Sequence, residues 1–216
     1  RPSIGGKDAA HTGLWLCRAL ARLNREEEAR AVVMEALEIA REVSSRHAEA
    51  QLLGTRARLE EDLTESVALL QQAAAITLEL NLMAPYVNQL TELCLHLVMQ
   101  GRSAQARRRI EEATGLFERL KPNAQQAVIG LNLLQARART MDVCGDFEAV
   151  LGCAEALWAA SRPPSARSIE VTLCLLEARA LRRLGRSPER AQALLAQGRA
   201  QAEAGGLRLQ QLEICV

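Results

Sequence analysis

The 216 residues of this chain carry 27 basic and 26 acidic side chains, so the formal net charge is only +1. A chain so close to neutrality has no general attraction for nucleic acid or for acidic membranes, and we expect it to bind neither directly. Hydrophobic residues make up 49% of the chain and aromatic residues only 2%. This composition allows a buried core, and it favours closely packed helices over a sheet.

A triplet of a small, an apolar and a small residue, spaced by four and three positions, returns five times along the chain. Its successive copies begin 37 to 43 residues apart, and this period indicates a solenoid in which each unit packs only on its neighbours. Because the three residues share one helical face, we place each triplet in the second helix of a helix pair. The triplets are Ala29/Val33/Ala36, Ser66/Leu70/Ala73, Ala106/Ile110/Ala113, Ala149/Cys153/Ala156 and Ala191/Leu195/Gly198.

The first helix of each pair is predicted from its own apolar spacing. The positions that carry this spacing, on the faces expected to be buried, are Leu16, Leu20 and Leu23, then Leu52, Leu53 and Gly54, then Leu90, Leu93 and Leu97, then Leu131, Leu134 and Ala138, and finally Leu173, Leu176 and Ala178. We expect a flexible segment over residues 1–9, a repeat domain of five helix pairs over 10–204, and the start of a further or capping helix over 205–216. Both ends of the sequence suggest an excised segment of a longer polypeptide.

Polar residues in the turns predict where the second helices begin. Asp62, Ser103 and Asp146 each offer a side-chain oxygen to the free amide groups of a helix start. Ser187 is followed by Pro188, and proline is well tolerated in the first helical turn.

Three runs of sequence resemble tetratricopeptide (TPR) repeats: Gly145–Ala149, Leu63–Leu70 and Leu175–Gly185. The resemblance covers residues 10–204 and includes turn glycines at Gly101, Gly145 and Gly185, although Asn24 and Glu61 stand where glycine is usual. It implies an all-α, right-handed superhelical solenoid of about five TPR-like helix-turn-helix repeats. The Leu/Ala/Arg-rich repeats of about 40 residues also resemble the sensor solenoids of bacterial MalT-like, LuxR-class regulators and related multidomain signalling proteins.

Enzymatic and metal-binding motifs are missing from the sequence. It contains no H-E-x-x-H, P-loop or G-x-S-x-G pattern, and its six cysteines form no C-x-x-C pair and have no histidine at ligand spacing. We therefore predict a non-enzymatic protein with no cofactor and no metal. The cysteines are expected to be reduced packing residues, typical of a cytoplasmic protein. Trp15 and Trp158 lie among apolar residues and are expected to pack between repeats.

A stripe of amide and arginine side chains along the first helices is predicted to face the concave groove of the solenoid, together with a few apolar or small residues such as Leu14 and Thr55. Amides can donate and accept hydrogen bonds along a peptide backbone, and arginine can hold a carboxylate at two points. The alternative is an ordinary solvated helix face. The candidate ligand-binding residues are Arg18, Gln51, Arg58, Asn88, Asn132, Gln135, Arg139 and Arg179.

Two functional hypotheses follow from these patterns. The first is a regulatory TPR-like module of a larger transcription regulator or signalling protein, whose groove binds a protein segment, a peptide or a small effector. No lysine lies in the predicted groove, which disfavours the Lys/Asn clamp by which some TPR domains bind chaperone C-termini. The second hypothesis is a scaffold that forms homo-oligomers through its terminal helices, including the apolar positions Leu207, Leu209, Leu212 and Ile214.

Overall fold

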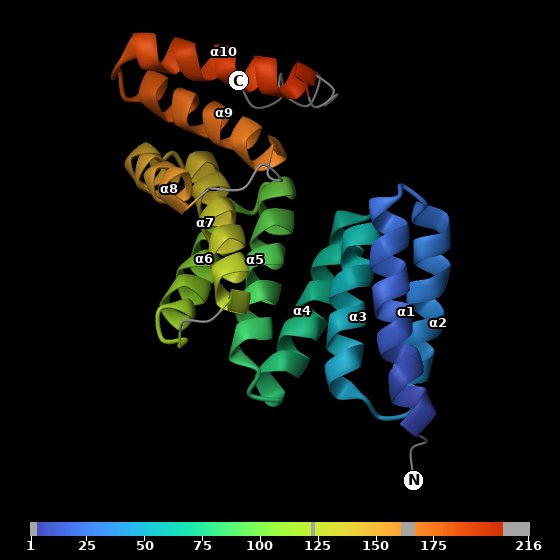
Figure 1. Ribbon diagram of the computed structural model, residues 1–216. Coiled ribbons are helices and arrows are strands. Elements are labelled where there is room, and N and C mark those ends of the chain that lie inside the picture. Colours follow the sequence, from blue (N-terminus) through green and yellow to red (C-terminus); the bar gives the residue numbers. More distant parts are fainter. Residues whose placement is uncertain (1–3, 122–123, 161–166, 205–216) are drawn as a thin grey trace.

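The computed structural model describes residues 4–121, 124–160 and 167–204, and this part of the chain folds into ten α-helices without a strand. The first and second helices of the pairs follow one another along an elongated stack (Figure 1). Their bounds are α1 Ile4–Arg22, α2 Glu26–Glu42, α3 Arg46–Leu59, α4 Leu63–Glu79, α5 Met83–Met99, α6 Ser103–Phe117, α7 Ala124–Cys144, α8 Phe147–Ala160, α9 Arg167–Arg183 and α10 Pro188–Ala204.

The five triplets lie on the even-numbered helices, as the sequence predicts, and their small residues let the partner helix approach. In the first pair, a Cβ atom added to Gly13 of α1 would lie 2.6 Å from the Cβ of Ala36 on α2. In the last pair, a Cβ atom added to Gly198 of α10 would lie 3.1 Å from the Cβ of Cys174 on α9. Larger side chains at these positions would force the paired helices apart.

The turns inside the helix pairs have a left-handed backbone conformation, and this explains why glycine or asparagine occurs there. Gly101, Gly145 and Gly185 have positive φ angles of 73°, 77° and 65°. Asn24 takes the same left-handed conformation, with φ of 56°, and asparagine tolerates it better than most side chains. Asn24 therefore replaces the usual turn glycine without a change in the path of the chain.

The predicted helix starts are confirmed in three of four turns. The carboxylate of Asp62 accepts a hydrogen bond from the Thr64 amide at 2.7 Å, and that of Asp146 accepts one from the Ala149 amide at 3.3 Å. Helix α10 begins at Pro188. The prediction for Ser103 is wrong, because this residue is the first of α6 and makes no capping bond, so that Arg102 occupies the cap position.

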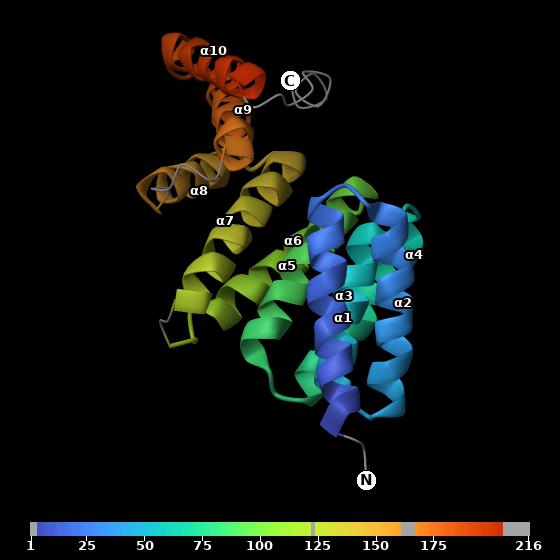
Figure 2. The ribbon, with the colours of Figure 1, turned by 45° about the vertical axis from the view of Figure 1, so that its right-hand side comes forward.

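The stack buries one long apolar core and three smaller clusters. The long core runs from Ala10 to Ala180 and includes the fully buried Leu70 and Ile110. The three smaller clusters join α8, α9 and α10. Each even helix packs on the odd helix that follows it, and α1 also packs on α3, α5 on α7 and α7 on α9. Figures 1 and 2 both show α1–α2 and α9–α10 at opposite ends of the molecule.

The first helix differs most from the sequence prediction. It begins at Ile4, so residues 4–9 are helical, although a flexible segment was expected. Packing reaches back to Ala10, which is fully buried, and outweighs the helix-breaking tendency of two early glycines. The prediction that Leu16 and Leu23 are buried is wrong, because they are 49% and 67% exposed.

The expected packing of Trp15 is also wrong, because its side chain is 66% exposed. Among the described helices, α1 packs mainly on α2 and α3. An apolar residue on another side of this helix therefore lies at the surface.

In α7, Leu133 is buried while Leu131 and Leu134 are only half-buried. Among the described helices, none is long and apolar enough to cross a membrane.

Candidate functional site

The eight residues predicted to bind a ligand all lie on odd-numbered helices, and all are at least partly exposed. We call the sides of the odd helices that carry them the odd-helix surface. Other positions of the predicted stripe are different: Leu14 and Thr55 are only 2% and 3% exposed and belong to the interior. The odd-helix surface is made up as follows: Arg18 on α1, Gln51 and Arg58 on α3, Asn88 on α5, Asn132, Gln135 and Arg139 on α7, and Arg179 on α9.

Two of the predicted arginines form bonds between neighbouring repeats near the C-terminal end. Arg139 of α7 donates a hydrogen bond to the Thr172 hydroxyl of α9 at 3.4 Å. Arg179 of α9 pairs with Asp142 of α7 at 3.1 Å. Burial raises the pKa of Asp142 in spite of the nearby positive charge of Arg179, and its Oδ1 atom has no hydrogen-bond partner among the described residues. These two arginines hold α7 and α9 together.

Arg58 connects α3 to α5 in a similar way. Its guanidinium lies 3.3 Å from the carboxylate of Glu92 and donates to the Thr55 hydroxyl at 3.2 Å. Glu92 is the acid that balances Arg58 on this part of the surface. The ring of His96, one turn further along α5, contacts the buried Ser66 hydroxyl at 2.8 Å, and burial lowers the pKa of this histidine.

Arg18 is the exception among the predicted arginines. No carboxylate of the described residues lies within ion-pair distance of it, and its buried Nε atom has no hydrogen-bond partner there. Its guanidinium instead lies 5.5 Å from the ring centre of Trp15, in cation–π contact. Burial and the like charge of Arg58 lower the pKa of Arg18. Arg18 is thus a half-buried cation. None of the described acidic residues pairs with it directly.

The four predicted amides remain available for ligands. Their side chains form no hydrogen bond with any other residue in the described part of the chain, while each is half-buried. A half-buried amide that is held on a helix loses little freedom when a ligand bonds to it. They occupy one side of three successive odd helices: Gln51, Asn88, Asn132 and Gln135.

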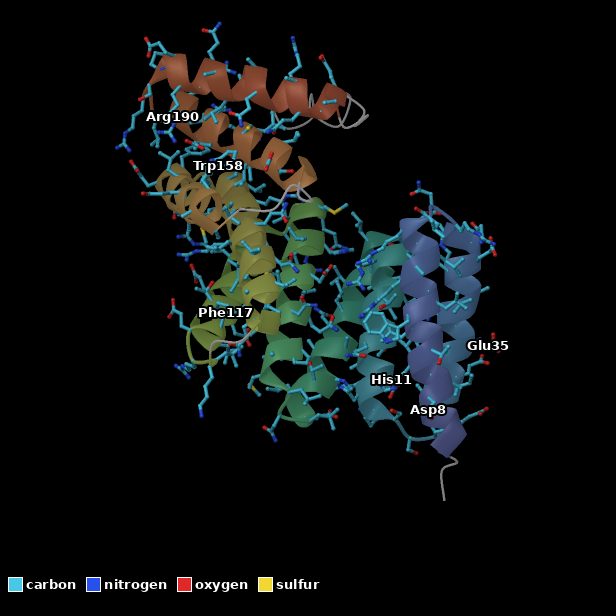
Figure 3. The ribbon with its side chains drawn as sticks, viewed as in Figure 1. Asp8, His11, Glu35, Phe117, Trp158 and Arg190 are labelled. Carbon is cyan, nitrogen blue, oxygen red and sulfur yellow. The ribbon has the colours of Figure 1, made fainter. Side chains whose placement is uncertain are left out.

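A second polar cluster, which the sequence patterns did not predict, lies on the other side of α9. The buried carboxylate of Glu177 accepts a hydrogen bond from the indole nitrogen of Trp158 at 2.7 Å and pairs with Arg190 at 2.5 Å. Figure 3 shows Trp158 and Arg190 at the same end of the α8–α10 stack. The sequence does contain a signal for this cluster: Glu177 is an acidic residue in the apolar run that precedes Ala178. A carboxylate that is buried in such a run requires a polar partner. Trp158 is half-buried, consistent with its predicted packing role.

The described residues contain no group of three or more histidine, cysteine or acidic side chains that could hold a metal ion. Cys17, Cys94, Cys153 and Cys174 are buried free thiols, and Cys144 is half-buried. Burial raises the pKa of Cys94 to about 12, so this thiol stays protonated and packs as an apolar group.

Comparison with known proteins shows the fold. A scan against protein-family models finds no match, and no curated protein matches the sequence. Similar crystal structures include two of a protein assigned as a kinesin light chain from Podosopora anserina: its nearly identical TPR-like repeats, and a variant of these repeats in which one glutamine is replaced by methionine. They are 21% and 20% identical to this chain, with TM-scores of 0.63 and 0.64. The matches cover 90% and 92% of this chain and 95% and 96% of those chains.

The fold is a TPR-like solenoid. The predicted all-α, right-handed superhelix of five helix-turn-helix repeats is therefore confirmed. At about one identical residue in five, the similarity extends to the arrangement of the helices and not to the ligand. The resemblance to MalT-like sensor solenoids stays a prediction.

Proposed function

We propose that this protein is a non-enzymatic interaction module that binds an acidic segment of another polypeptide along its odd-helix surface. Arg18 is the observation that carries this proposal, because a half-buried cation beside a second arginine gains most from an incoming carboxylate. The exposed ring of Trp15 next to it offers an apolar contact for the neighbouring ligand side chain.

The unengaged amides extend this binding site beyond one charged group. Gln51 lies on the same helix as Arg58, and Asn88 lies one helical turn from Glu92. Further along, Asn132 and Gln135 continue the row on α7. A row that spans α1 to α7 fits an extended or helical peptide better than a small effector, because amides can bond successive peptide groups.

Selection of short random peptides by display, followed by affinity measurements, tests this function. We expect the selected peptides to be enriched in Asp and Glu, and the double variant Arg18→Ala/Arg58→Ala to bind them about tenfold more weakly. Arg56→Ala is the matched control, because Arg56 lies on the same helix as Arg58 but pairs with Glu65 of α4. Peptides without acidic residues, or peptides that bind the double variant equally well, would contradict the proposal.

The MalT-like resemblance suggests a use for such binding. We propose that the solenoid belongs to a larger bacterial transcription regulator or signalling protein, in which ligand binding shifts a neighbouring effector domain between an inhibited and an active arrangement. The experiment is the activity of that larger protein with Arg18→Ala in the solenoid. An effector that responds normally to the ligand after this change would refute the regulatory role.

Self-association is a second candidate function, and the exposed apolar side chains of α1 favour it. Trp15 and Leu16 of α1 are 66% and 49% exposed, and Leu23, in the turn directly after this helix, is 67% exposed. The other predicted contact, through Leu207, Leu209, Leu212 and Ile214, lies outside the described residues. Light scattering over a wide concentration range decides between the two functions. A mass that rises with concentration, and falls back in Leu16→Glu/Leu23→Glu, supports self-association, whereas a constant monomer mass excludes it.

A further inference from the structure

A pocket of about 560 Å³ opens between α8, α9 and α10, on a different side of the solenoid from the odd-helix surface. Glu177 lines it, whereas Arg179, two residues further along α9, belongs to the odd-helix surface. Two residues of an α-helix are separated by about 200°, so the two side chains leave α9 in nearly opposite directions. This pocket is independent of the peptide-binding surface proposed above.

The carboxylate of Glu177 forms the base of the pocket. Its side chain is only 4% exposed. Its Oε2 atom accepts a hydrogen bond from Trp158 Nε1 at 2.7 Å, and this bond fixes the orientation of the carboxylate. Its Oε1 atom lies 2.5 Å from Nη2 of Arg190. A buried carboxylate is costly unless it is paired, so this oxygen requires a cation.

Arg190 supplies that cation from the solvent side. Its side chain is 64% exposed, and it lies in the first turn of α10 (Figure 3). Holding a long, solvated side chain in one geometry costs entropy, and this cost weakens the binding of Arg190 to Glu177. The carboxylate is therefore fixed while its cation is exchangeable. The structure already shows that a guanidinium group fits this position.

The rest of the lining favours a second cation of the same kind. Glu155 of α8 is exposed at the pocket and forms no ion pair with any residue in the described part of the chain. When Arg190 is displaced, the lining contains two carboxylates and no cation among its described residues. Leu151 and Leu181 provide apolar walls for the methylene groups that carry a guanidinium.

We infer that this pocket binds an arginine side chain of another polypeptide, which displaces Arg190 and pairs with Glu177. The incoming guanidinium bonds the free edge of the carboxylate that Trp158 orients. Its stem packs on Leu151 and Leu181, and Glu155 attracts its charge at the entrance. Arg190 acts as an internal competitor that occupies the site in the absence of the partner.

Nuclear magnetic resonance of the tryptophan indoles measures this binding directly, because the chain contains two tryptophans and Trp158 bonds the acceptor carboxylate. The Trp15→Phe variant assigns the two indole signals. We expect N-acetyl-arginine amide to shift the Trp158 signal, and N-acetyl-citrulline amide, which has the same shape without the charge, to leave it in place. A capped Ala-Arg-Ala peptide should bind at least as tightly as the amide.

The variants distinguish a binding site from a structural ion pair. Arg190→Ala should tighten binding about fivefold, since it removes the competitor, whereas Glu155→Gln should weaken it about threefold and leave the buried cluster intact. Glu177→Gln should abolish binding. Arg186→Ala is the control, because Arg186 pairs with Glu148 outside the pocket, and it should change nothing.

Three results would overturn the inference. Binding that Arg190→Ala leaves unchanged or weakens would show that Arg190 is no competitor. Equal shifts with the arginine and citrulline compounds would show that charge is not recognised. Binding of agmatine, which has no peptide backbone, together with failure of the Ala-Arg-Ala peptide would exclude a polypeptide partner.

Discussion

The two tryptophans of this chain differ in the charged groups around them, although each has an arginine nearby. Near the N-terminus, Trp15 is exposed and lies under Arg18, a cation without an acidic partner within ion-pair distance among the described residues. Near the C-terminus, Trp158 donates a hydrogen bond to the buried Glu177, and Arg190 pairs with this acid from outside. Similar residues therefore favour an anionic ligand at one end and a cationic ligand at the other.

The two regions also differ in how they are packed. The long core extends from α1 as far as α9, whereas the buried apolar residues of α10 belong to two of the three smaller clusters. The pocket at Glu177 is lined by Leu181 and Leu194, which belong to one of these smaller clusters. In a solenoid, each repeat is stabilised only by its neighbours, so local packing can differ strongly between the two ends.

The largest expected effect comes from packing. Leu70→Ala in the long core should lower the free energy of unfolding by about 3 kcal/mol, because it leaves a cavity at a fully buried position. Leu194→Ala, at the edge of the pocket and 8% exposed, should lower it by about 2 kcal/mol, because side chains beside a pocket can relax into part of the space that the substitution leaves. Urea unfolding followed by circular dichroism measures both. Equal losses would contradict the difference in packing.

Glu177→Gln should lower the free energy of unfolding by about 2 kcal/mol, since the indole of Trp158 loses a charged acceptor. Glu155→Gln is the matched change on the same pocket and should alter stability by less than about 0.5 kcal/mol. Urea unfolding of both variants tests this. Equal changes in the free energy of unfolding would contradict a structural role for the bond between Trp158 and Glu177.

Arg18→Met should stabilise the protein, in contrast to the substitutions above. We expect it to raise the free energy of unfolding by about 0.5 kcal/mol, because it removes a poorly solvated cation that Arg58 repels and keeps the apolar contact with Trp15. The same variant should bind acidic peptides more weakly. Thermal unfolding compares it with Arg56→Met, which breaks an ion pair and should not stabilise the protein. A destabilised Arg18→Met would mean that Arg18 has a structural role.

Asp142 is a buried acid, and its Oδ1 atom has no hydrogen-bond partner among the described residues. Its contribution to the free energy of unfolding should depend on pH. Its pKa is raised in the folded protein by burial, so the native state holds the proton more tightly than the unfolded chain. Its contribution to stability is therefore present below the ordinary carboxyl pKa and is lost as pH rises through the raised value. The free energy of unfolding of Asp142→Asn, relative to the unmodified protein, should increase over this interval. A pH-independent difference would contradict the raised pKa.

The smallest expected effect compares two buried thiols. Burial raises the pKa of both Cys17 and Cys174, but Arg58 and Arg18 oppose this rise at Cys17, whereas Glu177 and Glu170 add to it at Cys174 and bring its pKa to about 11. Alkylation by iodoacetamide, followed by mass spectrometry, should therefore begin at lower pH for Cys17. Reversal of this order would show that the charges of the two regions are wrongly assigned.

The repeat pattern was predictable from the sequence because it rests on local chemistry. Small residues such as Ala36 must recur where helices touch, and the turn residues must reach positive φ at fixed places, as Gly101 does. The exposure of Leu23 was not predictable from spacing, because it depends on where the stack ends. An apolar residue with helical spacing looks the same in the first repeat as in the third.

The candidate site was predictable only in part. Helical spacing correctly placed Arg18 and Asn88 on partly exposed sides of odd helices. It did not predict which arginine forms an ion pair with an acidic residue of the next repeat. Arg58 and Glu92, for example, are 34 residues apart in the sequence and come into contact only when the chain folds. Glu177 was missed for the same reason, since its partners come from two other helices.

A double titration of the two indole signals tests most directly the claim that the two ends of the solenoid bind ligands of opposite charge. One titration uses a short polyglutamate peptide and the other N-acetyl-arginine amide. We expect polyglutamate to shift the Trp15 signal alone and the arginine compound to shift the Trp158 signal alone. Movement of both signals with the same ligand, or of neither signal with either ligand, would contradict the claim.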